Sequence, residues 1–391
     1  MKSLFVHDHI FLHDGGFYYS KSGLPQGVLC RYADAFDHVD VICRAASRST
    51  KGLSPIVDKR ISFSPMHNIR SGAGLTKYMQ VRNAISEKVK DADVVVARLP
   101  STLGIIAVRL ARRQGVPYVI EVVGNAYEAN ILHGSMLGAL VAPIEHYLTR
   151  KEVKFANDVI YITENYLQSI YPSSGRRYVC PNVEVDRVEE SVVNERIKRR
   201  YEKKDIFRIG LIGSLDVNYK GHRQAISVVK NLRSKYKISD VELVFAGGGN
   251  QDRWRKVAIE NDIGSNLRID GVIPPGQPMM RWIDGMDMLL QPSLTEGQGR
   301  SIIEGMSRGC PVVASCVGGI PELLEGSMLS DPEDVERLTD ICAALVSKPE
   351  LLAVQSRRNW VKSSQFDAGL VERERRNIFS EIRLRLENAR S

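Results

Sequence analysis

The chain has 391 residues, of which 43% are hydrophobic and 26% charged, and a formal net charge of +8. These proportions are those of ordinary globular proteins, so they exclude a disordered or fibrous chain, and the length favours two domains over one. No apolar run approaches the ~18 residues that a membrane-spanning helix requires. The positive charge favours an anionic partner, which is a nucleotide phosphate, nucleic acid or an acidic membrane surface.

The first residues and the cysteines narrow the cellular setting. The N-terminal apolar stretch is interrupted at His7 and Asp8, too early for the core of a signal peptide, so we expect a cytoplasmic protein. The six cysteines are scattered without a CxxC pair, which indicates neither a zinc site nor a disulfide framework.

Short apolar runs alternate with helix-period stretches along the chain, which is typical of α/β architecture. In the first half we predict buried parallel strands at residues 3–7, 39–43, 92–97, 117–123 and 158–163. In the second half we predict them at residues 207–213, 241–247, 286–292 and 311–315. The pattern therefore predicts two doubly wound units.

The domain boundaries follow from changes in composition. Residues 1–185 form the predicted first Rossmann-like domain, and residues 186–206 are dense in charge and lack a strand pattern, as a linker would. Residues 207–365 form the second Rossmann-like domain. The helical segment 366–391 is a candidate to brace the first domain.

Loops that follow parallel strands are the first place to look for a ligand, because such sheets bind ligands beyond the carboxyl ends of their strands. Lys220 and Gly221 stand just before a predicted helix, where a lysine can meet a phosphate or simply be solvated. Gly247 and Gly248 let a backbone approach a ligand or turn the chain, and Gly16 follows the first strand in the same way. None of these forms a full dinucleotide fingerprint, which argues against an NAD-dependent oxidoreductase.

The segment "PSLTEGQGRSIIEGMSRGCPVVASCVGGIPELL", residues 292–324, carries the strongest signal. Its loop feeds a predicted helix, so the amides of Gly299, Arg300 and Ser301 would face an anion. Glu304, one turn into the helix, can accept two hydrogen bonds from a ribose diol, and Glu296 on the loop can reach a second ring. The alternative is that both glutamates only cap helix starts.

These residues resemble the retaining glycosyltransferases of family 4, which have the GT-B fold: two Rossmann-like domains that face each other across a cleft. The segment above looks like that family's signature over its whole length. "IGLIGSLDVNYKGHRQAI" is similar to the family's phosphate-binding strand and loop. More loosely, the first half resembles sugar transferases of bacterial surface-polysaccharide pathways.

The resemblance implies transfer of a sugar, with retained anomeric configuration, from a nucleotide-sugar donor to a hydroxyl of a glycan or lipid-linked acceptor. This would serve polysaccharide biosynthesis, of capsule, O-antigen or exopolysaccharide. It implies a donor in the second domain, an acceptor in the first, and neither metal nor cofactor; we favour a UDP-sugar over a GDP-sugar. The expected donor-binding residues are Gly16, Ser214, Lys220, Gly247, Gly248, Glu296, Gly297, Gln298, Gly299, Arg300, Ser301 and Glu304.

Within this set the resemblance implies separate roles. Glu304 would hold the ribose, Lys220 the diphosphate, Glu296 the hydroxyls of the donor sugar, and the Gly297–Ser301 backbone the phosphates. The catalytic candidates are Glu296, Lys220 and Asn125, the last standing where many relatives carry a histidine.

A second departure from the family is Ser214, where many relatives carry an arginine that pairs with the lysine. Either Arg223 or Arg300 substitutes for it, or the enzyme is slower. The missing arginine also keeps open a non-catalytic relative that acts as a nucleotide-sugar-binding partner subunit.

The excess positive charge has two remaining explanations. Nucleic-acid binding lacks any basic and aromatic recognition motif. Arg109, Arg112 and Arg113 either meet an anionic membrane that carries the acceptor, at the inner face, or form a solvated helix face.

Overall fold

The computed structural model describes residues 1–21, 23–69, 77–132, 136–186, 188–202 and 206–389. The chain divides into two compact units: Met1–Cys180 together with Glu372–Ser391, and Pro181–Val371. The segment 186–206, which we expected to be a linker, lies within the second unit. There helix α7 (Glu190–Glu202) packs on helix α13 (Pro349–Ser363), and Arg357 pairs with Glu190.

Among the described residues the first unit forms a nine-stranded sheet, and all five strands predicted for it are present. Its strands are β1 (Lys2–Asp14), β2 (Phe17–Tyr19), β3 (His38–Ala46), β4 (Pro55–Ile56), β5 (Ile61–Pro65), β6 (Val94–Leu99), β7 (Tyr118–Val122), β8 (Asp158–Tyr161) and β9 (Arg176–Val179). Seven strands are parallel in the order β5-β3-β1-β6-β7-β8-β9, while β2 and β4 add on in antiparallel pairs.

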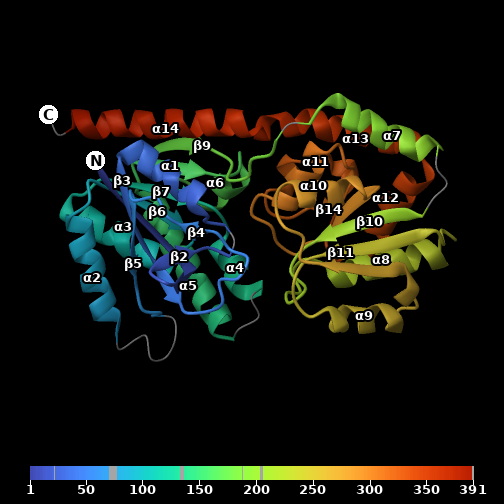
Figure 1. Ribbon diagram of the computed structural model, residues 1–391, viewed down its shortest axis with the longest axis horizontal. Helices are drawn as coiled ribbons and strands as arrows, with labels where there is room; N and C mark the ends of the chain where they lie inside the picture. Colours follow the sequence, from blue (N-terminus) through green and yellow to red (C-terminus); the bar gives the residue numbers. More distant parts are fainter. Residues whose placement is uncertain (22, 70–76, 133–135, 187, 203–205, 390–391) are drawn as a thin grey trace. The chain divides into compact units, whose positions relative to one another are not determined.

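The helices of the first unit flank this sheet (Figure 1). They are α1 (Gln26–Phe36), α2 (Tyr78–Lys90), α3 (Thr102–Gln114), α4 (Ala126–Leu132), α5 (Met136–Lys154) and α6 (Tyr166–Ile170). The ladder reverses direction at β1, since β3 follows it on one side and β6 on the other. This is the switch point at which open sheets of this kind bind ligands.

The hairpin between β1 and β2 explains two glycines of the sequence. Asp14 pairs with Phe17, so Gly15 and Gly16 are the two turn residues, with φ of 56° and 83°. A turn that needs positive φ at both positions favours glycine for conformational reasons alone. The assignment of Gly16 to the donor therefore stays a prediction that the turn does not require.

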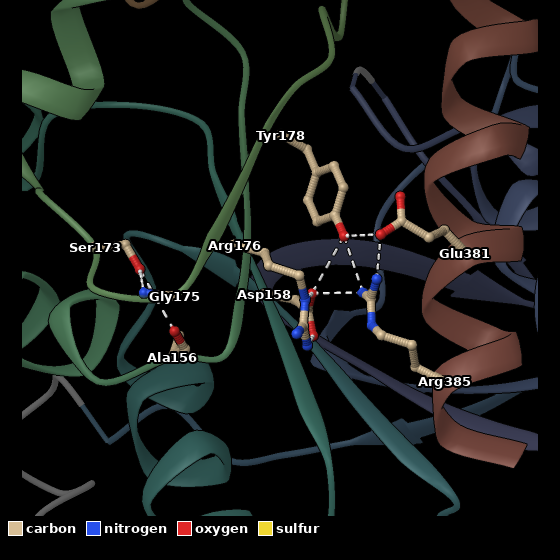
Figure 2. Close-up of polar contacts among 8 residues, drawn as sticks. All are labelled: Ala156, Asp158, Ser173, Gly175, Arg176, Tyr178, Glu381 and Arg385. Atoms are coloured by element: carbon tan, nitrogen blue, oxygen red, sulfur yellow. Dashed lines mark hydrogen bonds and ion pairs between the residues drawn. The ribbon is translucent and has the colours of Figure 1, made fainter. Parts of the chain in front are cut away.

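Helix α14 (Ala368–Asn388) starts in the second unit and continues into the first. Within the first unit it is held at β8 and β9, where Arg385 Nη2 lies 2.7 Å from an Asp158 oxygen and Tyr178 donates to Glu381 at 2.9 Å (Figure 2). Further along the same helix, Phe379 packs edge-on against the rings of Tyr32 and Phe36. The helix is thus a structural part of the first unit.

The second unit is a parallel sheet in the order β12-β11-β10-β13-β14-β15. Its strands are β10 (Phe207–Ile212), β11 (Val241–Ala246), β12 (Leu267–Gly271), β13 (Met288–Gln291), β14 (Val312–Ser315) and β15 (Leu329–Ser330). The four predicted strands correspond to β10, β11, β13 and β14, while β12 and the two-residue β15 were not predicted. Short strands at the sheet's margin carry little apolar pattern, and every residue of β12 is only half-buried.

Helices cover both faces of this sheet (Figure 1). Besides α7 and α13 they are α8 (His222–Ser234), α9 (Gln251–Glu260), α10 (Gln277–Asp284), α11 (Arg300–Ser307) and α12 (Val335–Ser347). Four short 3₁₀ helices span Gly264–Asn266, Ile320–Glu322, Gly326–Met328 and Ser364–Phe366. One apolar cluster joins α8, α9 and α12 to the sheet and another joins α10 and α11. Two such units confirm the predicted pair of doubly wound domains.

Candidate functional site

Three loops meet at the carboxyl edge of the second sheet, and glycines allow their close approach. A Cβ on Gly221 would lie 2.0 Å from the carbonyl oxygen of Pro292, and one on Gly247 would lie 1.8 Å from that of Gly213. Because no side chain fits at those distances, the loops after β10, β11 and β13 can pack backbone to backbone only with glycine. Leu294 N also donates to Tyr219 O at 2.7 Å, which ties the first loop to the third.

Lys220 and Glu296 come together at this edge. Lys220 Nζ lies 2.6 Å from Glu296 Oε1, with 21% and 9% of the two side chains exposed. The Ser293 hydroxyl donates to the same oxygen at 3.0 Å. Gly213 makes room for the lysine, since a Cβ there would lie 2.8 Å from Lys220 Cγ. Two residues that were predicted from separate motifs thus form one ion pair at the mouth of the loops.

Helix α11 begins where the sequence predicted. Its N-cap, Gly299, has φ of 81°, and the first intrahelical bonds run from the amides of Ile302 and Ile303 to Gly299 O. The amides of Arg300 and Ser301 precede those bonds, so they lie outside the helix ladder and can serve an anion. The Ser301 side chain is committed elsewhere, because its hydroxyl donates to Gln291 at 3.2 Å.

Glu304 differs from Glu296 in having no partner. Its carboxylate takes part in no hydrogen bond or ion pair within the described part of the chain. Burial raises its pKa, an effect that the positive charge of Arg300 opposes. A largely desolvated carboxylate without a donor carries a free-energy cost that hydroxyl or amide groups of a ligand can offset.

Two other members of the predicted donor set have structural partners. The side-chain oxygen of Gln298, which is buried, accepts a bond from Asn182 N at 3.3 Å. Gly297 O accepts a bond from Gly319 N at 3.0 Å, so the loop after β14 is packed against the loop after β13. Both residues help to hold the shape of the loops.

The position of the missing arginine, Ser214, is exposed, and its hydroxyl only accepts a 3.4 Å bond from the amide of Asp216. Gly248, whose carbonyl accepts from Leu215 N at 2.8 Å, lies next to this turn. Of the two arginines considered as substitutes, Arg300 is exposed beside Glu304. Arg223 lines a pocket of about 270 Å³.

That pocket contains a second cation, which the sequence did not single out. Its lining consists of Asn218, Arg223, Gln224, Arg253, Trp254 and Leu294. Arg253 stacks over the Trp254 ring at 4.6 Å and donates to Asn218. Because Arg253 comes from α9, about thirty residues after Lys220 in the sequence, only the fold brings it to the loop after β10.

His222, the first residue of α8, is another residue that sequence reasoning missed. It is fully buried, stacks on Trp254 at 4.8 Å and packs edge-on against Phe245. Burial first, and then the charge of Lys220, lower its pKa to about 4. The imidazole is therefore neutral near pH 7 and adds no positive charge beneath the lysine.

In the first unit Asn125 lies between β7 and α4, at the carboxyl edge of the sheet. Its amide nitrogen donates to Glu128 at 2.8 Å and to Tyr166 at 3.3 Å, and its oxygen accepts from Tyr127 N at 3.0 Å. The side chain is half-buried and held in one orientation by these bonds. Unlike Glu304, it is already engaged with its own unit.

A second polar cluster lies at the switch point of this sheet. The register of β1 against β3 shifts between Val6 and Ile10, which places His7, Asp8 and His9 in a bulge. Asp8 pairs with Arg44 at 2.8 Å and accepts from Thr102 N, at the start of α3, at 2.5 Å.

Burial is the largest influence on the two imidazoles of this bulge. It lowers the pKa of His7 to about 3 and that of His9 to about 4, and Arg98 adds to both effects. The visible signal in the sequence is the polar triplet that interrupts an apolar strand.

Two of the three arginines that we considered for a membrane surface are committed within the unit. Arg109 and Arg112 both form ion pairs with the buried Glu152, at 2.7 and 2.9 Å. Arg113 is exposed. No helix among the described residues is long and apolar enough to cross a bilayer.

Comparison with known families agrees with this architecture. A model described as "Glycosyl transferase 4-like domain" matches residues 26–178, and one described as "Glycosyl transferases group 1" matches residues 206–348. The chain belongs to this glycosyltransferase family, which confirms the resemblance drawn from residues 292–324.

Individual relatives extend over most of the chain. It is 32% identical over 348 residues to Protein CapJ of Staphylococcus aureus, covering 87% of this chain and 85% of that one. It is 26% identical to the 2-deoxystreptamine glucosyltransferase of Streptomyces kanamyceticus, covering 77% of this chain and 83% of that one. The protein is thus a glycosyltransferase.

Solved structures confirm the GT-B fold. Anabaena Alr3699/HepE in complex with UDP matches with a TM-score of 0.68 at 16% identity, covering 97% of this chain and all of that one. WaaG, a glycosyltransferase involved in lipopolysaccharide biosynthesis, matches with a TM-score of 0.64 at 14% identity, covering 97% and 100%.

Proposed function

We propose that this protein transfers a sugar from a nucleotide-sugar donor, a UDP-sugar in preference to a GDP-sugar, to a hydroxyl of a glycan or lipid-linked acceptor. The anomeric configuration is retained and no metal ion takes part. The acceptor belongs to a polysaccharide pathway, such as that of a capsule, O-antigen or exopolysaccharide. We place the reaction in the cytoplasm, with the enzyme peripheral on the inner face of the membrane.

The observation that carries this proposal is the contrast between the two glutamates of the second unit. Glu296 holds Lys220 at 2.6 Å, while Glu304 lies one turn into α11 without a partner. A nucleotide sugar offers the complementary groups: an anionic diphosphate for the lysine and helix amides, and a ribose diol for the free carboxylate. The UDP bound by Alr3699/HepE and its complex with UDP-glucose support a donor of this kind.

In the proposed reaction the bond between the anomeric carbon and the diphosphate oxygen breaks, and the pair of electrons leaves with the nucleoside diphosphate. The acceptor oxygen forms its bond to the anomeric carbon from the same face. Its proton passes to an oxygen of the departing diphosphate, so the atoms and charges balance.

The residues of the chain serve this step by position and charge. Lys220 and the amides of Arg300 and Ser301 neutralise charge that grows on the diphosphate, which stabilises the transition state more than the bound substrate. Glu296 keeps the lysine in place and accepts bonds from hydroxyls of the donor sugar. Asn125, fixed by its own hydrogen bonds, orients the sugar from the first unit.

Binding of nucleotides tests the donor site first. In a thermal-shift panel of UDP, GDP, ADP, TDP and CMP we expect the largest rise in melting temperature with UDP, because a ligand that binds only the folded state stabilises it. The same rise in the presence of EDTA supports metal independence. A rise that is equal for all five nucleotides would contradict the selective site.

Chemistry is tested with the donor that the panel indicates. Slow hydrolysis of the UDP-sugar by the pure protein, with the sugar released first as the anomer of the donor, is the expected result. A protein that binds UDP tightly but never releases sugar would instead be a binding subunit, and the proposed transfer would be wrong.

A further inference from the structure

The outer face of α5 is unusual among the surfaces of the first unit. Leu140, Ile144 and Tyr147 are 72%, 59% and 63% exposed, and their spacing places them on one stripe of the helix. Lys151 and Lys154 continue the same stripe and are also exposed. The stripe is thus apolar along its first half and basic along its second.

Helix α4, which packs against α5, extends the apolar half. Tyr127 and Ile131 are exposed on it, and the Tyr127 ring meets His146 of α5 at 6.2 Å. Figure 1 shows the two helices in the same part of the unit. Because α4 begins directly after Asn125, the apolar surface starts next to a catalytic candidate of the first unit.

Acidic residues do not interrupt this surface. The described residues of α4 and α5 include three acids, and each is bonded to groups of its own unit: Glu128, Glu145 and Glu152. The basic end of the stripe also carries Arg150, which is exposed, and Phe155, over whose ring the Lys154 ammonium lies at 5.8 Å. The exposed charges beside the apolar residues are therefore all positive within the described part of these helices.

We propose that α4 and α5 form a docking surface for an anionic lipid bilayer. Leu140, Ile144 and Tyr147 enter the headgroup region, while Arg150, Lys151 and Lys154 meet lipid phosphates. This pairing of an exposed apolar stripe with adjacent basic residues is what an interfacial helix needs, since either signal alone binds weakly. It rests on the proposed function in one respect: a lipid-linked acceptor would then be presented beside Asn125.

Co-sedimentation with vesicles tests the surface directly. The probes are vesicles of phosphatidylcholine mixed with phosphatidylglycerol, and vesicles of phosphatidylcholine alone. We expect the wild-type protein to sediment with the mixed vesicles and at least about tenfold less with phosphatidylcholine. The triple variant Arg150→Gln, Lys151→Gln, Lys154→Gln should lose that preference, and the double variant Leu140→Gln, Ile144→Gln should lose binding to both.

Matched controls lie in the second unit. Val354 and Val361 are 60% and 62% exposed on α13, and their replacement by Gln should leave sedimentation unchanged. The same result is expected for replacement of three exposed lysines, Lys198, Lys230 and Lys256, by Gln. If these controls lower binding as much as the α5 variants do, general charge or hydrophobicity explains the binding and the proposed surface is wrong.

Two further measurements separate the surface from the proposed enzyme function. The UDP-induced thermal shift should be the same in the wild type and in both α5 variants, so its absence from all of them would count against the donor site and not against the surface. Size-exclusion chromatography completes the test. A wild-type dimer that Leu140→Gln, Ile144→Gln converts to a monomer, without vesicle binding, would show that a second copy covers the face and would overturn the proposal.

Discussion

The carboxyl edges of the two sheets achieve order in different ways. In the second unit, close-packed glycine loops leave few side chains at the edge: one ion pair, Lys220–Glu296, and one carboxylate without a partner, Glu304. In the first unit, side chains such as Asp8 and Asn125 are bonded to groups from several other elements. The comparison teaches that the second edge is built to receive a ligand with its backbone, whereas the first is built from a side-chain network already satisfied.

The largest expected effect is on Lys220. Lys220→Ala should lower kcat by about 10²- to 10³-fold, because the diphosphate loses its nearest cation as charge develops on it. Initial rates of sugar transfer or donor hydrolysis measure this. Lys230→Ala, on the exposed side of α8, is the matched control and should keep full activity. Full activity in a folded Lys220→Ala protein would mean that the helix amides suffice and that the ion pair is structural.

The next effect concerns pH and the buried His222. Its pKa falls from 6.5 in the unfolded chain to about 4 in the fold, so between those values only the unfolded chain binds the proton. Stability is therefore complete above pH 6.5 and decreases as pH falls towards 4, by at most about 3 kcal/mol.

Melting temperature as a function of pH measures this effect. His222→Phe should flatten the decrease, whereas His67→Phe, at an exposed position, should leave it unchanged. A wild-type stability that does not change between pH 6.5 and 4 would contradict a neutral buried imidazole.

Glu304→Ala should weaken UDP binding by about 30-fold, since hydrogen bonds to a charged group contribute about 2 kcal/mol. A modified ligand sharpens the test. The wild type should bind 2′-deoxy-UDP more weakly than UDP, and the variant should not distinguish them. Isothermal titration gives both constants. If the variant still prefers UDP, the ribose is recognised elsewhere and Glu304 has another role.

Asn125 tests the other side of the comparison. Asn125→Ala should lower kcat by about tenfold while the Kd for UDP stays unchanged, because the residue is proposed to orient the sugar and not the nucleotide. Circular dichroism is needed as a control, since the loss of three hydrogen bonds can loosen α4. Equal losses in kcat and UDP affinity would contradict its separate role.

The smallest expected effect comes from restoring the family's arginine. Ser214→Arg should tighten UDP binding by a few-fold, as an added exposed cation contributes less than about 1 kcal/mol. If Arg253 or Arg223 already supplies the charge, the gain will disappear in Ser214→Arg and return when the arginine of the pocket is replaced by Gln. The double-mutant cycle identifies which of the two acts.

The same contrast explains what the sequence could predict. Gly221, Gly247 and Gly299 are required by close backbone approach or positive φ, so they recur at fixed spacing from their strands and made the second edge legible. Lys220 and Glu296 stand inside those motifs. The strands β10, β11, β13 and β14 were predicted because their apolar residues are consecutive and buried on both faces.

Other features depend on residues that are distant along the chain. Asp8 bonds to Thr102, and Arg253 reaches the loop that contains Asn218; no local pattern encodes either contact. The arginines at 109 and 112 looked exposed on a helix of regular spacing, but Glu152 from α5 pairs with both. Helix α5 itself was not singled out, because its apolar residues are compatible with a buried face until the packing is known.

The path of helix α14 has a consequence for biosynthesis. The second unit is continuous in sequence, whereas the first is completed only by Glu372 and the residues that follow it. During translation, Tyr32 and Phe36 leave the ribosome long before Phe379, the ring that covers them. The first unit to be synthesised is therefore the last that can finish folding, and its apolar groove stays open while the whole second unit is made.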